Sequence, residues 1–185
     1  MKLVLKTAAT VKPVSVADIL AHSRIDAREE DFYLRNLIDA AVVEAELYTW
    51  RRFCTQTWYQ YFDAFADPLM LSYPPLSSIT AVTYTDTDEA TQTVAGTVYE
   101  AGENNEIGLV RLKYGQDWPT LVLQQPDSVR VEFVCGYGGA ADVPEPIRQA
   151  IRVHVGHAFV HREGEERLPQ AFYDLLTPYR CWEFA

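Results

Sequence analysis

Two histidines one helical turn apart are the residues of this sequence whose spacing best suits metal chemistry. His157 and His161 stand at i and i+4 in the stretch HAFVH, so their imidazoles would lie on one face of a helix. Zinc hydrolases use the same spacing in H-E-x-x-H, but Ala158 stands where the catalytic Glu is required. A third ligand would have to come from elsewhere, for example Glu163 or Glu166. A metal-dependent hydrolase using His157 and His161 is one alternative; histidines at the edge of a core are the simpler one.

A strand, three glycines and a helix follow one another in residues 131–151, in the order that phosphate-binding loops use. A Walker loop needs a Lys directly after its glycines, and a dinucleotide loop needs G-x-G-x-x-G leading straight into a helix. Here Gly136, Gly138 and Gly139 are followed by Asp142, whose charge repels phosphate, and by two prolines. The pattern favours a plain connection between sheet and helix, in which glycines supply positive φ, over a nucleotide site.

The other reactive residue types carry no catalytic signature. There is no G-x-S-x-G, and Cys135 stands among apolar residues, as a buried and inert thiol would. The carboxylates gather in predicted turns, where a solvated surface is their usual meaning. Three cysteines, far apart and odd in number, argue against a disulfide framework and fit a reducing compartment. The residues alone therefore indicate a scaffold or binding protein, with no catalytic residue, cofactor loop or metal site assigned.

The charge balance bears on possible partners. Sixteen Lys and Arg against 26 Asp and Glu leave a formal net charge of −10. Gripping DNA or anionic lipid relies on excess basic residues, so neither is expected, although DNA could slide past such a surface. No apolar run approaches the roughly 18 residues of a membrane span, and the N-terminal apolar stretch is too short for a signal peptide. We expect a soluble protein made in a cytoplasm.

The elements that must position these residues begin with a long helix, predicted for residues 29–53. One apolar row follows the i, i+3, i+4, i+7 template and predicts the face turned to the core. A second row consists of Val43, Leu47 and Trp50. A helix with two apolar faces is either deeply buried or shared with another subunit. These three residues are therefore candidates for a subunit interface.

Three more helices are predicted. One covers residues 15–25, with Ser15 as its N-cap and Asp18 completing a capping box. Another begins at Pro144, because proline is tolerated in a first turn, and a short one begins at Pro169.

Residues between the second and third helices have the composition and alternation typical of β-strands. Thr, Val and aromatic residues alternate in about six short runs, separated by Pro, Gly and Asp. The predicted fold class is α+β: a helical bundle body of about four helices, residues 1–54 and 141–185, with an antiparallel β-rich insertion, residues 55–140.

Six stretches, in a fixed order across most of the chain, carry a family resemblance. They are HSRIDAREEDFYLRNLIDAA (22–41), YPPLSSITAVTYTD (73–86), YGQDWP (114–119), SVRVEFVCGYG (128–138), VPEPIRQAI (143–151) and LP…LLTPYR (168–180). Together they resemble the head–tail connector (adaptor) proteins of tailed bacteriophages and gene transfer agents, in the larger version with a β-rich insertion. The extra histidine of HAFVH departs from that pattern.

The resemblance implies a structural virion protein without catalysis or cofactor. Its copies would form a homo-oligomeric ring, generally a dodecamer, below the portal protein of a DNA-filled capsid. The ring would extend the channel, through which DNA passes without specific binding, and would offer a platform to the next neck component, a stopper or tail terminator. The implied location is the neck of the virion, with no membrane contact and with synthesis in the host bacterial cytoplasm. A tail-completion or stopper protein of the neck is an alternative.

The aromatic C-terminus is the candidate partner-binding segment, because in this family the corresponding segment is a candidate for portal docking. Its residues are Phe172, Tyr173, Tyr179, Arg180, Trp182 and Phe184. The simpler alternative is that Phe172 closes the helical core. We expect the tail CWEFA (181–185) to be held only by a partner, and the tail beyond Pro178 to be the part that docks. Deleting residues 179–185 should then leave the fold intact and weaken attachment to the portal.

Overall fold

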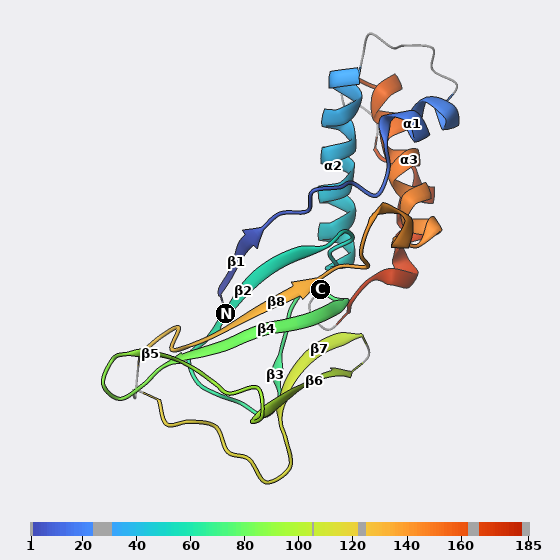
Figure 1. Cartoon of the computed structure of the whole chain (residues 1–185). Coiled ribbons are helices and arrows are strands. Elements are labelled where there is room, and N and C mark those ends of the chain that lie inside the picture. The colour runs from blue at the N-terminus through green and yellow to red at the C-terminus, as the bar shows by residue number, and fades with distance from the viewer. Residues whose placement is uncertain (1, 24–30, 105, 122–124, 163–166, 183–185) are drawn as a thin grey trace. The chain divides into compact units, whose positions relative to one another are not determined.

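The computed structural model describes residues 2–23, 31–104, 106–121, 125–162 and 167–182 (Figure 1). The fold is α+β, with four α-helices among these residues and antiparallel sheets. Contacts divide the chain into two compact units. The sheet unit comprises Met1–Ala9 and Thr55–Gly136, and the helical unit comprises Thr10–Cys54 and Tyr137–Ala185.

The sheet unit contains strands β1 to β8. Their bounds are Lys2–Thr7, Gln56–Phe62, Leu69–Met70, Leu76–Thr85, Thr91–Thr93, Tyr99–Asn104, Ile107–Leu112 and Val129–Cys135. One sheet has five strands in the order β1-β2-β8-β4-β5, and the other has three in the order β3-β7-β6. Sequence analysis found six of these strands and missed β1 and β5.

The first strand corrects the predicted boundary at the N-terminus. β1 pairs antiparallel with β2, from Lys2 opposite Tyr61 to Thr7 opposite Thr57, so residues 1–9 belong to the sheet unit and not to the helical part. The partner strand begins far along the chain, with two helices in between. Local periodicity holds no trace of such a pairing, because strand pairing is a long-range property.

The core of the sheet unit follows the period of two that a strand imposes. Along β8, buried and half-buried residues alternate, and the buried ones are Val129, Val131, Phe133 and Cys135. Side chains from the second sheet, Leu69 and Val110 among them, join the same cluster. The two sheets approach closely at Gly108, where an added Cβ would lie 2.6 Å from Leu76 Cβ, so only glycine fits that position.

The helical unit contains α1 (Val16–Ser23), α2 (Asp31–Thr49), α3 (Glu145–Val160) and α4 (Gln170–Leu176), with 3-10 turns η2 (Ala140–Asp142) and η3 (Thr177–Tyr179). Helix α3 packs against α1, α2 and α4 (Figure 1). The core of the helical unit is apolar, and its largest fully buried side chains are Phe53, Phe172, Ile19, Leu34, Ile147, Ile151 and Leu176. None of the described helices combines the length and the apolar character needed to cross a membrane.

The capping box predicted for α1 is confirmed. The Ser15 N–H donates to Asp18 Oδ2 at 2.9 Å, and the Asp18 N–H donates to Ser15 Oγ at 3.2 Å. The backbone and hydroxyl donors of Ser15 stabilise the ionised carboxylate and lower the pKa of Asp18 below its ordinary value. The box fixes the start of α1 and the direction of the chain that enters it.

Helix α2 ends at Thr49 rather than at the predicted residue 53. Trp50 has a φ of 57°, in the left-handed region that ends a helix. Beyond it, the Phe53 N–H donates to Glu46 Oε1 at 2.9 Å, and Arg52 Nη1 lies 3.5 Å from Glu46 Oε2. Arg52 is therefore buried beside the helix end and does not form part of a last helical turn.

Candidate assembly surfaces of the helical unit

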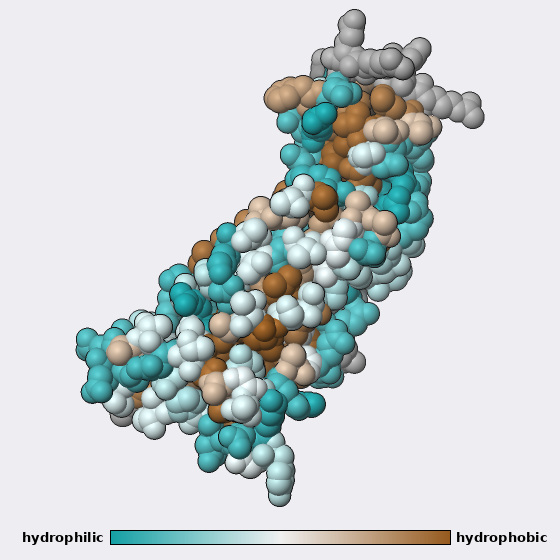
Figure 2. All heavy atoms as spheres, viewed as in Figure 1, coloured by the Kyte–Doolittle hydropathy of each residue, from teal (hydrophilic) through white to brown (hydrophobic). Residues whose placement is uncertain are grey.

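Helix α2 presents an apolar row to solvent. Phe32, Val43 and Leu47 are 78%, 56% and 64% exposed, and Asn36 and Ala40 continue the row between them. These five residues, called here the α2 stripe, fall within about 80° of one another around the helix at about 100° per residue. The buried residues of α2 lie on the opposite side. Figure 2 shows hydrophobic residues at the surface of the helical unit, bordered by hydrophilic ones.

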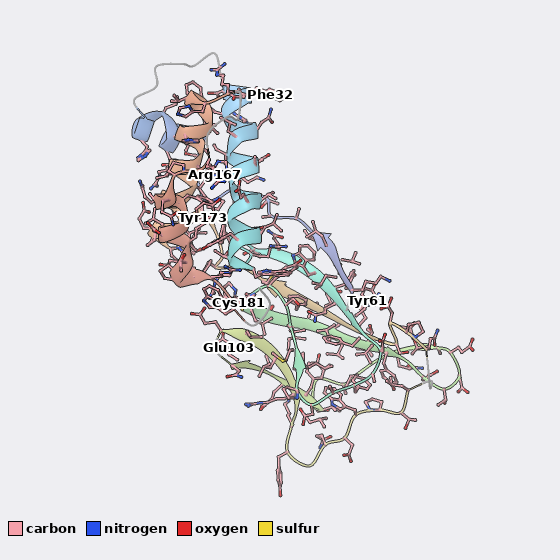
Figure 3. All side chains as sticks on the ribbon, turned by 180° about the vertical axis from the view of Figure 1, so that it is seen from behind. Phe32, Tyr61, Glu103, Arg167, Tyr173 and Cys181 are labelled. Carbon is pink, nitrogen blue, oxygen red and sulfur yellow. The ribbon has the colours of Figure 1, made fainter. Side chains whose placement is uncertain are left out.

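Of the three residues proposed from sequence as a subunit interface, two are exposed on α2 and the third lies beyond the end of the helix. Val43 and Leu47 are exposed on α2, as a free interface requires. Trp50 lies beyond the helix and is half-buried, so it does not continue the row. Phe32, near the N-terminal end of α2 (Figure 3), replaces it as the far member of the stripe. Sequence reasoning missed Phe32 because the second row was not extended backwards at intervals of three and four.

A groove runs beside α2, where the chain entering α1 crosses it. It has a volume of about 560 Å³ and is called here the α1 groove. Its apolar lining is Val11, Val14, Val16, Ala17, Ile38 and Ala140, and its polar lining is Lys12, Ser15, Arg35 and Asp39. Lys12 Nζ lies 2.9 Å from Asp39 Oδ1, which closes one side of the groove with an ion pair.

Hydrogen bonds hold the C-terminal segment against the end of α2. The Cys181 N–H donates to the Thr49 carbonyl at 2.9 Å, and the hydroxyl groups of Tyr48 and Thr177 are 3.0 Å apart. Arg51 Nε donates to the carbonyl of Tyr179. The expectation that the tail CWEFA is held only by a partner is therefore wrong for Cys181, whose backbone bonds to α2. Removing residues 179–185 would leave the Thr49 carbonyl and Arg51 Nε without these partners and would empty the site of the buried Cys181 side chain, so that deletion would not leave the fold intact.

Four of the C-terminal candidates form an aromatic cluster with α2. The Arg180 guanidinium lies 5.2 Å from the ring centre of Tyr48 and 4.4 Å from that of Trp182. Tyr173 meets Tyr48 edge-on at 5.2 Å, on α4 (Figure 3). Trp182 is 65% exposed, whereas Tyr173, Tyr179 and Arg180 are half-buried. The most exposed part of this cluster is the Trp182 ring, with the Arg180 guanidinium against it.

Of the remaining two candidates, Phe172 contacts the cluster from the core side, with its ring centre 5.1 Å from that of Tyr173. Phe172 is fully buried, with its ring 5.4 Å from that of His154, so it belongs to the core of the helical unit and presents nothing to a partner. Its position supports the simpler alternative, in which this residue closes the core. Phe184 lies outside the described residues.

The histidine pair lacks a third ligand in the described part of the chain. His157 and His161 have ring centres 4.6 Å apart. No group of three His, Cys, Asp or Glu that could hold a metal ion occurs among the described residues, which do not include Glu163 and Glu166. Two imidazoles are fewer than the three protein ligands of a catalytic zinc site.

In the glycine loop, the carboxylate of Asp142 accepts a backbone N–H that a bound phosphate would need. The Gly139 N–H donates to Asp142 Oδ2 at 2.8 Å. Gly136 and Gly138 have φ values of 110° and 130°, which agrees with the interpretation that glycines here supply positive φ. A nucleotide phosphate would meet a negative charge at the start of η2.

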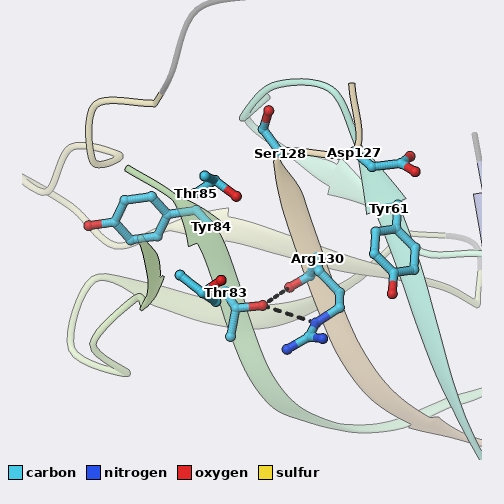
Figure 4. Close-up of a pocket in the computed structure, with 8 residues that line it drawn as sticks. Tyr61, Thr83, Tyr84, Thr85, Asp127, Ser128 and Arg130 are labelled. Atoms are coloured by element: carbon cyan, nitrogen blue, oxygen red, sulfur yellow. Dashed lines mark hydrogen bonds between the residues drawn. The ribbon is translucent and has the colours of Figure 1, made fainter. Parts of the chain in front are cut away.

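The sheet unit has a small polar hollow of about 150 Å³ near the ends of β4 and β8 (Figure 4). Arg130 Nε donates to Thr83 Oγ1 at 3.1 Å, and its guanidinium lies 4.8 Å from the Tyr59 ring centre. Tyr61, Asp127 and Ser128 also line the hollow. Arg130 thus already contacts Thr83 and Tyr59 of the same unit. The hollow is therefore described better as part of the polar surface of the sheet than as a binding site.

The fold is shared with chains in solved structures of gene transfer agent (GTA) particles. A chain from the virion of a native GTA particle has a TM-score of 0.81 at 20% identity, covering 97% of this chain and 95% of that chain. Over the same shares, a chain from the neck of an empty GTA particle, computed with C6 symmetry, has a TM-score of 0.79 at 20% identity. One from the neck of a native GTA particle, computed with C12 symmetry, has 0.75 at 18%, again over 97% and 95%. No protein-family model and no curated protein matches the sequence.

Proposed function

We propose that this protein is a structural virion component, the head–tail connector (adaptor) of a phage-like particle. The observation that carries the proposal is the likeness of nearly the whole chain, 97% of it, to a chain in a native GTA virion. A coincidental likeness would more often be confined to one of the two units. The particle necks that contain two of the similar chains were computed with C6 and C12 symmetry. We accordingly propose a ring of this protein, with twelve copies.

The two units take different parts in this proposal. The helical unit is the body of the connector, and the strands between α2 and α3 are an insertion into that body. The α2 stripe provides contacts between copies, since a monomer gains nothing from exposing Phe32, Val43 and Leu47. The ring sits below the portal protein, extends the DNA channel and supports the next neck component, a stopper or tail terminator.

The aromatic cluster is proposed to dock on the portal protein. Tyr173, Tyr179, Arg180 and Trp182 belong to the residue types that carry most binding energy in protein interfaces. Trp182 is the member with the greatest exposure, and the cation of Arg180 lies against its ring. A partner would therefore gain a large aromatic contact without having to order a free chain end.

The charge of the chain agrees with a channel wall that DNA must traverse. A formal net charge of −10 repels phosphates at short range, although salt screens this repulsion beyond about 8 Å. DNA then passes without specific binding. Catalysis has no part in this proposal.

Native mass spectrometry of the purified protein mixed with its portal tests the proposal. The expected result is a portal-bound oligomer of this chain, and a matched Trp182→Ala sample should show a reduced bound fraction. A persistent monomer that never binds the portal would contradict the connector role. Electron cryomicroscopy of the particle neck then distinguishes a ring against the portal from a stopper or tail-completion position further down.

A further inference from the structure

We infer that neighbouring copies join head to tail, with the α2 stripe of one copy seated in the α1 groove of the next. This inference rests on the proposed function, because it concerns how copies meet within the ring. The occupant of the groove is thus a second copy of this chain. Four features of the helical unit lead to it.

The first feature is the shape of the stripe. Its exposed members recur at intervals of three and four, which is the spacing that makes a helix face a continuous ridge. From Phe32 to Leu47 the ridge runs about 22 Å at 1.5 Å per residue. Within the described residues, other elements of the chain do not cover it, since Phe32, Val43 and Leu47 all remain more than half exposed. Such a ridge fits the groove of another helical surface.

The second feature is the apolar character of the groove. Val11, Val16, Ala17 and Ala140 line it around Ile38, which is 3% exposed at its floor. Val11 is 45% exposed although it stands beside this floor. An apolar hollow of this size left open to water is unfavourable, and filling it with Val and Leu side chains removes apolar area on both sides of the contact.

The third feature is charge. Two carboxylates border the stripe by their positions around the helix, Asp39, which pairs with Lys12 of its own copy at 2.9 Å, and Glu44, which lies 2.9 Å from His154 Nε2. Two cations border the groove, Lys12 and Arg35, whose side chains are 48% and 69% exposed. Lys12 and Arg35 pair with Asp39 and Asp31 of their own copy, so docking exchanges exposed pairs within a copy for pairs between copies. Such an exchange adds little affinity but favours one register of docking over others.

The fourth feature is that ridge and groove are different surfaces of one unit. Their centres lie about 100° apart around the axis of α2 at about 100° per residue. A contact between two different surfaces leaves a free ridge on one copy and a free groove on the other, so it can repeat and close into a ring. Pairing of ridge with ridge would instead stop at a dimer.

Disulfide trapping in assembled particles tests the contact. Val43→Cys combined with Ala17→Cys places one thiol on the ridge and one at the groove, both at exposed positions. The native Cys54, Cys135 and Cys181 are all buried, and this burial shields them from mild oxidation. For Cys54, burial also raises the pKa of the thiol to about 11. The expected result is a non-reducing gel ladder that extends beyond the dimer.

The matched control is Val43→Cys combined with Val160→Cys, since Val160 is 72% exposed on α3 and does not line the groove. It should give no ladder. Particles that contain the Val43/Ala17 variant but show no ladder, or dimers already with Val43→Cys alone, would overturn the head-to-tail contact while the connector role stands. Particles that lack the protein altogether would overturn the connector role and the contact together.

Discussion

The two units differ in how much apolar surface they leave open. In the described part of the sheet unit, the exposed aliphatic side chains Val4, Leu5 and Met70 reach only 39%, 44% and 40%, although the single aromatic Tyr114, in the loop after β7, is 105% exposed. In the helical unit, Phe32 and Val160 reach 78% and 72%. Two facing sheets enclose a core between them, so the central strands, such as β8, bury their apolar face within the unit. A small set of helices covers only one side of α2, and the other side stays exposed within the described residues. The difference agrees with the proposal that contacts between copies cover this side of the helical unit.

The largest expected effect is a difference in the free energy of unfolding between a core variant and a surface variant of the helical unit. Phe172→Ala should lower the free energy of unfolding by about 3–5 kcal/mol, because it empties a fully buried site. Trp182→Ala is the control from the same C-terminal region and should cost about 1 kcal/mol or less, the value of an exposed cation–π contact. Urea denaturation of both variants measures the difference. If both variants lose equally little unfolding free energy, Phe172 is not a core residue and becomes a docking candidate again.

The next largest loss of stability is expected in the sheet unit, where the side-chain amide of Gln60 is fully buried. Gln60 Nε2 donates to the Met70 carbonyl at 2.9 Å, and Gln60 Oε1 accepts from the Ser72 N–H at 2.8 Å. Gln60→Leu keeps the volume but leaves both backbone groups without this partner, at an expected cost of about 1–3 kcal/mol. Gln92→Leu, at an exposed position of β5, is the control. If thermal melts of the two variants coincide, the sheet core does not depend on this amide.

These differences also show what local sequence patterns can predict. The capping box at Ser15 and the helices that follow Pro144 and Pro169 were predictable, because each depends on residues within one turn of the helix start. The exposed row at Val43 and Leu47 was predictable too, since periodicity along one helix is a local property.

The missed features all depend on contacts between distant parts of the chain. Pairing of β1 with β2, the bond from Arg51 to the Tyr179 carbonyl, and the α1 groove each join residues that no short window contains. The early end of α2 has a different cause. Trp50 is a residue type that rarely takes positive φ, so its left-handed backbone carries no sequence signal such as a glycine would give.

A smaller effect is expected at the start of α1, beside the groove, and it depends on pH. Asp18→Asn should cost about 1 kcal/mol at pH 7, the usual value of a capping interaction. Because the folded pKa of Asp18 is lowered, its contribution is fully present above the unfolded pKa of about 3.9 and is lost as the pH falls through the lower folded value. Denaturation of wild type and variant at a series of pH values measures this. A gap that persists undiminished at the acid end would assign the effect to something other than ionisation.

The smallest expected effect on stability is also the sharpest test of the comparison between the units. Leu47→Ser should change the free energy of unfolding by no more than about 0.5 kcal/mol, because the side chain is already 64% exposed. The same change should weaken ring formation, since in the ring Leu47 passes from water into the α1 groove of the next copy. Ile38→Ser on the opposite face of α2 is the control, and there the loss of stability should come first. A marked destabilisation by Leu47→Ser in the isolated protein would mean that the chain covers this face itself, and the helical unit would then need no neighbour to complete it.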